Sequence, residues 1–154
     1  MNRKQADFAA APSSLSIIIP MLNEADAIVR TLTSAVNSIQ KNISDRVSVE
    51  LILVDGGSED NSVELARELL EAIQDSDFRF QILNSVSGRT VQMNLGAENA
   101  SGDLLVFLHA DTIVPADFIA ELAKVLRLEV YGWGRFDVAL SGWHPMLRIV
   151  EWFM

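Results

Sequence analysis

Four short runs of apolar, largely β-branched residues recur along the chain, and segments with helical spacing separate them. The runs cover residues 15–20, 49–54, 78–83 and 104–108. Runs of this length favour buried strands, whereas apolar residues at every third or fourth position favour helices. Strands that alternate with helices imply right-handed crossovers within one sheet. We therefore predict an α/β fold with a mainly parallel sheet and flanking helices, in which residues 104–108 are buried on both faces.

Helical spacing predicts four helices, three of them between the strands. They cover residues 25–40, residues 63–73, the segment that Arg89 opens and Gly102 ends, and residues 116–127. Asn23 and Asp60 are predicted to cap the first two helices. Beyond these elements, residues 131–140 indicate a further strand and residues 146–153 an amphipathic segment.

Length and composition bound the class of protein. A chain of 154 residues with 49% apolar residues is long enough for one domain with a core. We assign residues 1–14 to a flexible tail without signal-peptide character and residues 15–154 to the domain. A formal charge of −9 argues against a nucleic-acid partner, which requires a basic surface. The absence of cysteine excludes disulfides and thiolate zinc sites and is compatible with a cytoplasmic location.

Polar loops follow the first, second and fourth predicted strands, and carboxyl ends of parallel strands share one edge of a sheet. The residues expected to converge there are Asn23, Glu24, residues 55–58 and residues 109–112. Asp111 is the candidate ligand of a divalent cation that bridges two phosphates of a nucleotide, with His109 in its shell. Arg89 opens a helix, where a phosphate binds readily. Asp55 ends a strand beside two glycines, where a base or ribose could lie flat.

Each of these residues also has a purely structural explanation. A single Asp after a strand is often a turn residue, Asn23 could serve only as a cap, and Arg89 could form an exposed ion pair. His109 is at least as often an ordinary hydrogen-bonded histidine as a ligand. Three polar strand ends at one edge favour a binding site more strongly than any one of them alone.

Several motifs occur in an order that resembles a known family. They are residues 16–24, 54–60, 89–96, 100–103 and 108–112. Together they are similar to the signature of the family 2 inverting glycosyltransferases, which have the GT-A fold. The Val-Asp-Gly-Gly-Ser and His-Ala-Asp forms, with residues 133–137, resemble the subgroup called radical-SAM/selenodomain-associated transferase 2.

The resemblance implies transfer of a sugar from a nucleotide-diphospho-sugar to an acceptor that the sequence does not name, with inversion. The residues on the nucleotide-sugar side would be Pro20, Asn23, Glu24, Asp55, Arg89 and His109. Among them, Asp55 would lie near the base and Arg89 near the base or the diphosphate. Asp111 matches the second acid of the family's Asp-X-Asp motif and would bind Mn²⁺ or Mg²⁺.

The sequence departs from the family pattern in two residues and lacks a recognisable catalytic base. Gly56 stands where a second acid usually follows the second strand, so the sequence does not identify the base of the nucleotide. His109 replaces the first acid of the Asp-X-Asp motif, and because Mg²⁺ prefers oxygen ligands we expect either a lower affinity for the metal or a preference for Mn²⁺. Inverting transfer also needs a general base. Asp137 and Glu151 are the only acids after Glu129 and match no family motif, so we expect a C-terminally incomplete chain without the acceptor half.

Other classes of function are alternatives. The apolar residues 143–154 favour a catalytically incomplete module that forms a homo-oligomer or joins another chain. Trp133, Trp143 and Trp152 could make a peripheral membrane contact, although core packing explains them better. A sugar-nucleotide pyrophosphorylase would need a Gly-rich basic loop after the first strand, and a nicotinamide-binding protein would need Gly-x-Gly-x-x-Gly there. Residues 21–24 contain neither.

Overall fold

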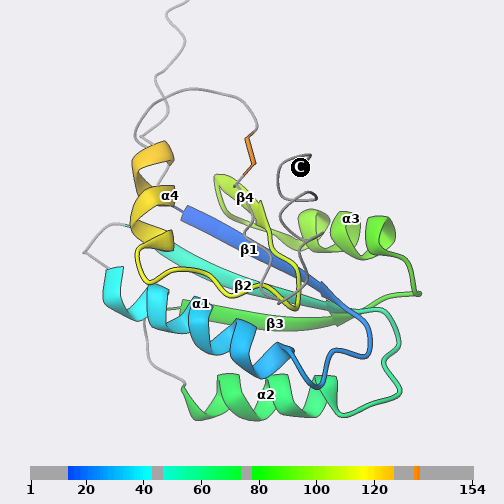
Figure 1. Ribbon diagram of the computed structural model, residues 1–154. Coiled ribbons are helices and arrows are strands. Elements are labelled where there is room, and N and C mark those ends of the chain that lie inside the picture. The colour runs from blue at the N-terminus through cyan, green and yellow to red at the C-terminus, as the bar shows by residue number, and fades with distance from the viewer. Residues whose placement is uncertain (1–13, 43–46, 74–77, 127–133, 136–154) are drawn as a thin grey trace, which may run out of the picture.

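The computed structural model describes residues 14–42, 47–73, 78–126 and 134–135. Its elements are β1 (Ser14–Met21), α1 (Ile28–Asn42), β2 (Ser48–Asp55), α2 (Ser62–Ala72), β3 (Phe78–Asn84), α3 (Arg89–Asn99), β4 (Leu104–Phe107) and α4 (Phe118–Leu126) (Figure 1). The predicted alternation of strands and helices is confirmed. The predicted tail before Ser14, most of the strand at 131–140 and the segment at 146–153 lie outside the described residues.

The sheet has four parallel strands in the order β3-β2-β1-β4. β1 occupies the interior, where both of its faces and both of its edges are covered. Its most apolar residues, Ile17, Ile18 and Ile19, are all 0% exposed. A strand buried on both faces requires a continuous apolar run, which is why this segment and not a more polar one is central.

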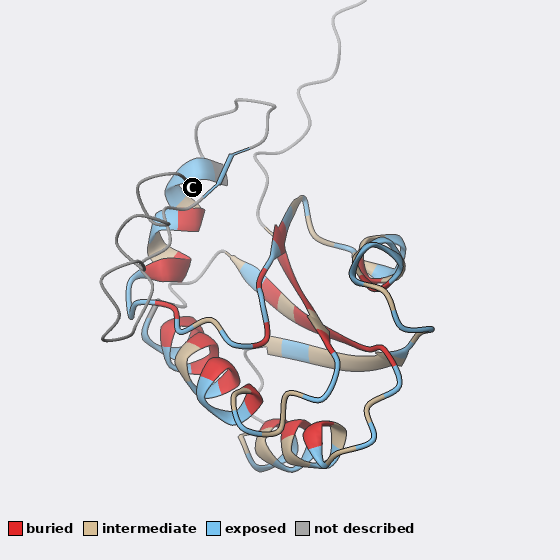
Figure 2. Cartoon of the chain, turned by 45° about the vertical axis from the view of Figure 1, so that its right-hand side comes forward, coloured by how far each residue is buried: buried red, intermediate tan, exposed pale blue. Residues whose placement is uncertain are grey.

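Helices cover the two faces of the sheet unequally. Figure 2 shows α1, α2 and α4 on one side of the sheet and α3 on the other. The larger core cluster lies under the first group of helices, and the smaller cluster of Ile18, Ile52 and Val54 lies on the α3 side. α3 approaches closely at Gly96, where an added Cβ would lie 2.4 Å from Cγ2 of Ile18. The glycine therefore sets how near this helix comes to β1.

The prediction that residues 104–108 form a strand buried on both faces is wrong. β4 ends at Phe107 and is an edge strand of the described sheet. Val106 is buried against the larger cluster, whereas Leu105 and Phe107 are 38% and 44% exposed. The physical reason is that α3, the described helix on this side of the sheet, packs mainly on β1 and β2 and not on β4.

Several predicted element ends are also wrong. α1 begins at Ile28 and not at residue 25, because a turn occupies residues 25–27. Gly102 does not end α3, which stops at Asn99. A Cβ at Gly102 would lie 2.5 Å from Oγ of Ser16, so this glycine serves close packing against β1. Ser14, placed in the tail from sequence, is the first residue of β1.

The helices that the structure describes include none that combines the length and apolar character needed to cross a membrane.

Candidate functional site

Asn23 joins the loops that follow β1 and β2. Its backbone N–H donates to Oγ of Ser58 at 2.9 Å, and its Oδ1 accepts the N–H of Glu59 at 2.8 Å. Its φ of 54° lies in the left-handed region, which asparagine tolerates better than most residues. The prediction that Asn23 caps α1 is wrong, because α1 begins only at Ile28 and the side chain bonds another loop.

A second set of bonds joins the same two loops. The N–H of Glu24 donates to Oγ of Ser62 at 2.7 Å, and the N–H of Ala25 donates to Oδ2 of Asp60 at 3.1 Å. Asp60 was expected to cap α2, but the N-cap residue is Asn61, without a side-chain bond. The carboxylate of Asp60 instead accepts the N–H and Oγ–H of Ser62, and the hydroxyl bond holds its pKa below the ordinary value.

Asp55 uses its carboxylate to build its own loop. Its oxygens accept the N–H of Gly57 at 3.0 Å, the N–H of Ser58 at 3.1 Å and the Oγ–H of Ser58 at 2.6 Å. Gly57 has a φ of +91°, which L residues with a side chain rarely adopt. Asp55 is buried, and its hydrogen bonds order the loop on which the nucleotide base is expected to lie.

Gln92 is a buried residue at this edge that sequence reasoning missed. Its Nε2 donates to the carbonyls of Met21 and Val54, both at 2.8 Å, and the side chain is 3% exposed. A single glutamine in a helix does not indicate in the sequence that its side chain is buried or that it bonds to strand ends. The usable signal is its spacing of four from Gly96, since both residues lie on the face of α3 that packs on the sheet.

The loop after β4 alternates between buried and exposed residues. Leu108 donates its N–H to the carbonyl of Ile18 at 2.9 Å, and the carbonyl of Ala110 accepts the Oγ1–H of Thr31 at 2.7 Å. Leu108 and Ala110 are buried, whereas His109 and Asp111 are exposed. The two anchored residues thus present the imidazole and the carboxylate outward.

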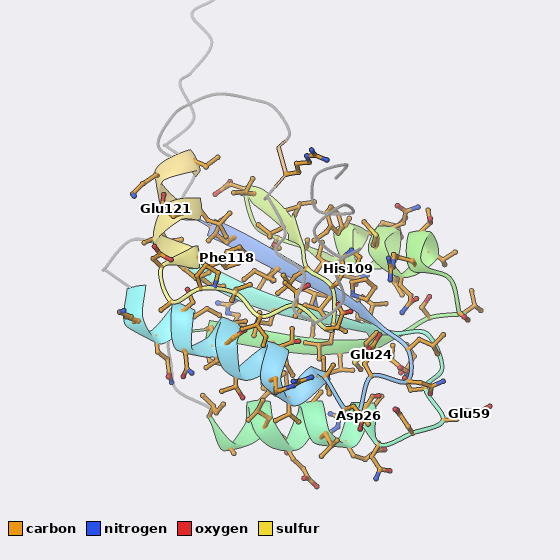
Figure 3. The ribbon with its side chains drawn as sticks, viewed as in Figure 1. Glu24, Asp26, Glu59, His109, Phe118 and Glu121 are labelled. Atoms are coloured by element: carbon orange, nitrogen blue, oxygen red, sulfur yellow. The ribbon has the colours of Figure 1, made fainter. Side chains whose placement is uncertain are left out.

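The charges that act on Glu24 indicate that all three loops lie near one another at the carboxyl ends of the strands. Burial raises the pKa of this half-buried carboxyl, and the charges of Asp111 and Asp60 raise it further. Arg89 and His109 act in the opposite direction. Charges perturb a carboxyl in this way only when they are near it. Figure 3 shows Glu24 and His109 at the carboxyl ends of the strands, and the predicted convergence of the loops is confirmed.

Pro20 lies at the same edge, paired with Val54 in the register of β1 and β2. Arg89 is the first residue of α3, as predicted. Asp137 and Glu151, which match no family motif for a general base, lie outside the described residues.

A metal ion at this edge would need further ligands in addition to the described side chains. Among the described residues, no group of three His, Asp, Glu or Cys side chains is arranged to hold an ion. A cation that bridges phosphates commonly takes only one or two protein ligands and completes its shell with phosphate and water. Exposed His109 and Asp111 therefore fit the protein's share of such a site.

Two curated relatives carry the same name, undecaprenyl-phosphate 4-deoxy-4-formamido-L-arabinose transferase. The protein of Salmonella choleraesuis (strain SC-B67) is 33% identical over 121 residues, which are 75% of this chain and 34% of that protein. The protein of Aeromonas hydrophila subsp. hydrophila is 33% identical over 113 residues, 71% of this chain and 32% of that protein. The chain spans about a third of the length of these relatives.

Solved structures share the fold. The mannosyltransferase PcManGT from Pyrobaculum calidifontis, in complex with GDP-Man and Mn²⁺, matches with a TM-score of 0.61 and 23% identity over 83% of this chain and 37% of that chain. Glucosyl-3-phosphoglycerate synthase from Mycobacterium tuberculosis, in complex with Mg²⁺ and UDP, matches with a TM-score of 0.52 and 25% identity over 75% of this chain and 40% of that chain. The parallel sheet and its strand-end loops thus have the GT-A architecture.

The chain belongs to glycosyl transferase family 2, whose sequence model matches residues 16–146.

Proposed function

We propose that this chain is the donor-binding part of a glycosyltransferase that transfers a sugar from a nucleotide-diphospho-sugar to an acceptor, with inversion and with assistance from a metal ion. The observation that carries the proposal is the convergence of Glu24, Arg89, His109 and Asp111 at the carboxyl edge of a GT-A sheet. Arg89 and His109 suit an anionic ligand, and the carboxylates of Glu24 and Asp111 suit the cation that accompanies it.

Arg89 and the start of α3 would hold the diphosphate. Gly88, the N-cap residue of α3, has no side chain that could cap the first N–H groups of the helix. The first N–H groups of the helix and the guanidinium of Arg89 are therefore the natural partners of phosphate oxygens. Asn23 and Glu24 would line the nucleotide side with Pro20, and the ordered Asp55 loop would lie under the base.

Asp111 would hold the cation, with His109 beside it. When bound, such an ion neutralises charge on the departing nucleotide diphosphate. Mn²⁺ accepts an imidazole nitrogen more readily than Mg²⁺ does, so His109 favours Mn²⁺. PcManGT was solved with Mn²⁺ and glucosyl-3-phosphoglycerate synthase with Mg²⁺, which supports a divalent ion of one of these two kinds.

The acceptor and the general base are expected to belong to a further part of the protein. The relatives are about three times longer than the matched segment. Self-association through residues 143–154 and membrane contact by the C-terminal tryptophans concern residues outside the described part and stay predictions. The cytoplasmic location expected from the cysteine-free sequence also stays a prediction.

Calorimetric titration with UDP, GDP and TDP in the presence of Mn²⁺ tests the proposal. We expect one of these nucleotides to bind, and Asp111→Ala to weaken its binding about tenfold or more because the cation loses its carboxylate. Asp117→Ala, which removes another exposed Asp six residues further along, is the matched control and should bind like the wild type. Absence of heat with all three nucleotides at millimolar concentration would refute the proposal.

A further inference from the structure

The amide of Gln92 occupies the point where the sheet gives way to the site. Both of its N–H groups are taken by the carbonyls of Met21, the last residue of β1, and Val54, next to the last residue of β2. The carbonyl of Met21 also accepts the N–H of Gly56 at 2.9 Å. One side chain on α3 thus fastens that helix to the two strands that lead into the Asn23 and Asp55 loops.

Gly56 leaves room for this amide. A Cβ built on Gly56 would lie 3.0 Å from Cδ and Nε2 of Gln92 and 3.1 Å from its Oε1. A side chain at position 56 would press against the Gln92 amide and strain its two bonds to the strand ends. The glycine at this position, where an acid was expected from the family pattern, and the buried amide of Gln92 therefore form a matched pair.

We propose that Gln92 is the positioning residue of the nucleotide site, where it fills the space above Gly56 and fixes α3 so that Arg89 meets the diphosphate. The inference rests on the proposed function. Gln92 lies one helical turn after Arg89, and its own N–H donates to the carbonyl of Gly88 at 3.0 Å. A shift of the amide would therefore move the start of the helix.

Packing alone does not explain an amide at this position. The side chains that cluster between α3 and this face of the sheet are apolar, including Ile18 and Val54 from the strands and Leu95 from α3. Burial of an amide among them costs free energy that its hydrogen bonds offset, and an apolar side chain of equal length would leave the carbonyls of Met21 and Val54 without this donor. The amide gives orientation, because its two bonds set both the height and the rotation of α3 above the strand ends.

A double-mutant cycle between Gln92 and Arg89 tests the proposal, with the affinity for the nucleotide diphosphate and Mn²⁺ as readout. Gln92→Met keeps the length and removes the bonds, and should weaken binding about tenfold, because Arg89 and the first N–H groups of α3 would both be displaced from the diphosphate. Arg89→Ala should weaken binding about fivefold in the wild type and much less in the Gln92→Met background, because Arg89 is already misplaced there. A general loss of stability would instead leave the two effects additive.

Gln81→Met is the matched control. Gln81 is also a glutamine in contact with α3, where its Nε2 donates to the carbonyl of Asn99 at 3.4 Å, at the end of the helix away from Arg89. The Gln81→Met substitution should leave the affinity for the nucleotide diphosphate unchanged. If Gln92→Met does not fold, Gly56→Ala applies the same test, since the added methyl group would press on the amide from 3.0 Å.

Three outcomes overturn the inference. Folded Gln92→Met or Gly56→Ala protein with affinity within twofold of the wild type shows that the amide does not position the site. Additive effects of Gln92→Met and Arg89→Ala show that the two residues act independently. If the wild-type protein binds no nucleotide, the proposed function fails first and this inference fails with it.

Discussion

Glu24 lies at the carboxyl ends of the strands, the carboxyl edge, and Glu50 lies near their amino ends, the amino edge. Both carboxyls are half-buried, but their pKa values are shifted in opposite directions. Burial alone would raise the pKa of Glu50, but hydrogen bonds lower it. Oγ of Ser16 donates at 2.5 Å, and the N–H and Oγ of Ser101 donate at 2.6 and 3.0 Å. At Glu24 burial raises the pKa and nearby Asp111 raises it further.

The contrast separates a structural carboxylate from one that is open to a ligand. Glu50 has hydroxyl and amide donors that stabilise its charge, so it ties the turn before β4 to β1 and β2. Glu24 shares its surroundings with other carboxylates and with Arg89, and a bound cation would relieve the repulsion between the carboxylates. A pocket of about 250 Å³ lies at the amino edge beside Glu50 and Arg79. We favour the carboxyl edge for the site because charge and strand-end loops converge there and not at the pocket.

Gly102→Ala should have the largest effect and would test how tightly the amino edge is built. The new Cβ would lie 2.5 Å from Oγ and 2.6 Å from the backbone N of Ser16, and backbone cannot move aside. We expect a loss of about 2–3 kcal/mol in the free energy of unfolding, measured by urea denaturation. Gly134→Ala is the control, because a Cβ there meets no atom within 4 Å. A loss below about 0.5 kcal/mol would show that the edge is loosely packed.

Glu50→Gln should have the next largest effect. The amide keeps the shape but loses the charge that Ser16 and Ser101 stabilise, which should cost about 1 kcal/mol of unfolding free energy. Glu68→Gln, an exposed acid on α2, provides the baseline. Nucleotide affinity should not change. If it does, the two edges are coupled and the contrast between them breaks down.

The smallest effect is the pH dependence of the two carboxyls. The folded pKa of Glu50 is below the ordinary value of 4.5, so its contribution is present above that value and is lost as pH falls through the folded pKa. The folded pKa of Glu24 is above 4.5, so its ionisation removes stability as pH rises through that pKa.

Melting temperatures from pH 3 to pH 7 measure both signs. Glu50→Gln should flatten the acid side of the profile, and Glu24→Gln should raise the melting temperature slightly at pH 7. An unchanged or lower melting temperature for Glu24→Gln at pH 7 would mean that Glu24 is not destabilised in the folded protein.

The sequence predicted the elements and the edge at which the loops meet, because both follow from local apolar spacing and from the direction of parallel strands. Residues 109–112 reached the same edge as Asn23 for this reason. The sequence predicts the wrong roles for Asn23 and Gly102 and does not indicate the role of Gln92. Each depends on a contact with a segment far away in the chain, such as Gln92 with Met21, and no local pattern records such a contact.

The pairing of β1 with β4 has a consequence for synthesis on the ribosome. Ser14 and Asp103, which bond across these strands, are 89 residues apart in sequence. At cellular rates of elongation, roughly 4 to 18 s separate the emergence of the two segments. During that interval the isoleucine-rich central strand has a vacant side, which is a natural target for chaperones and for aggregation of the nascent chain.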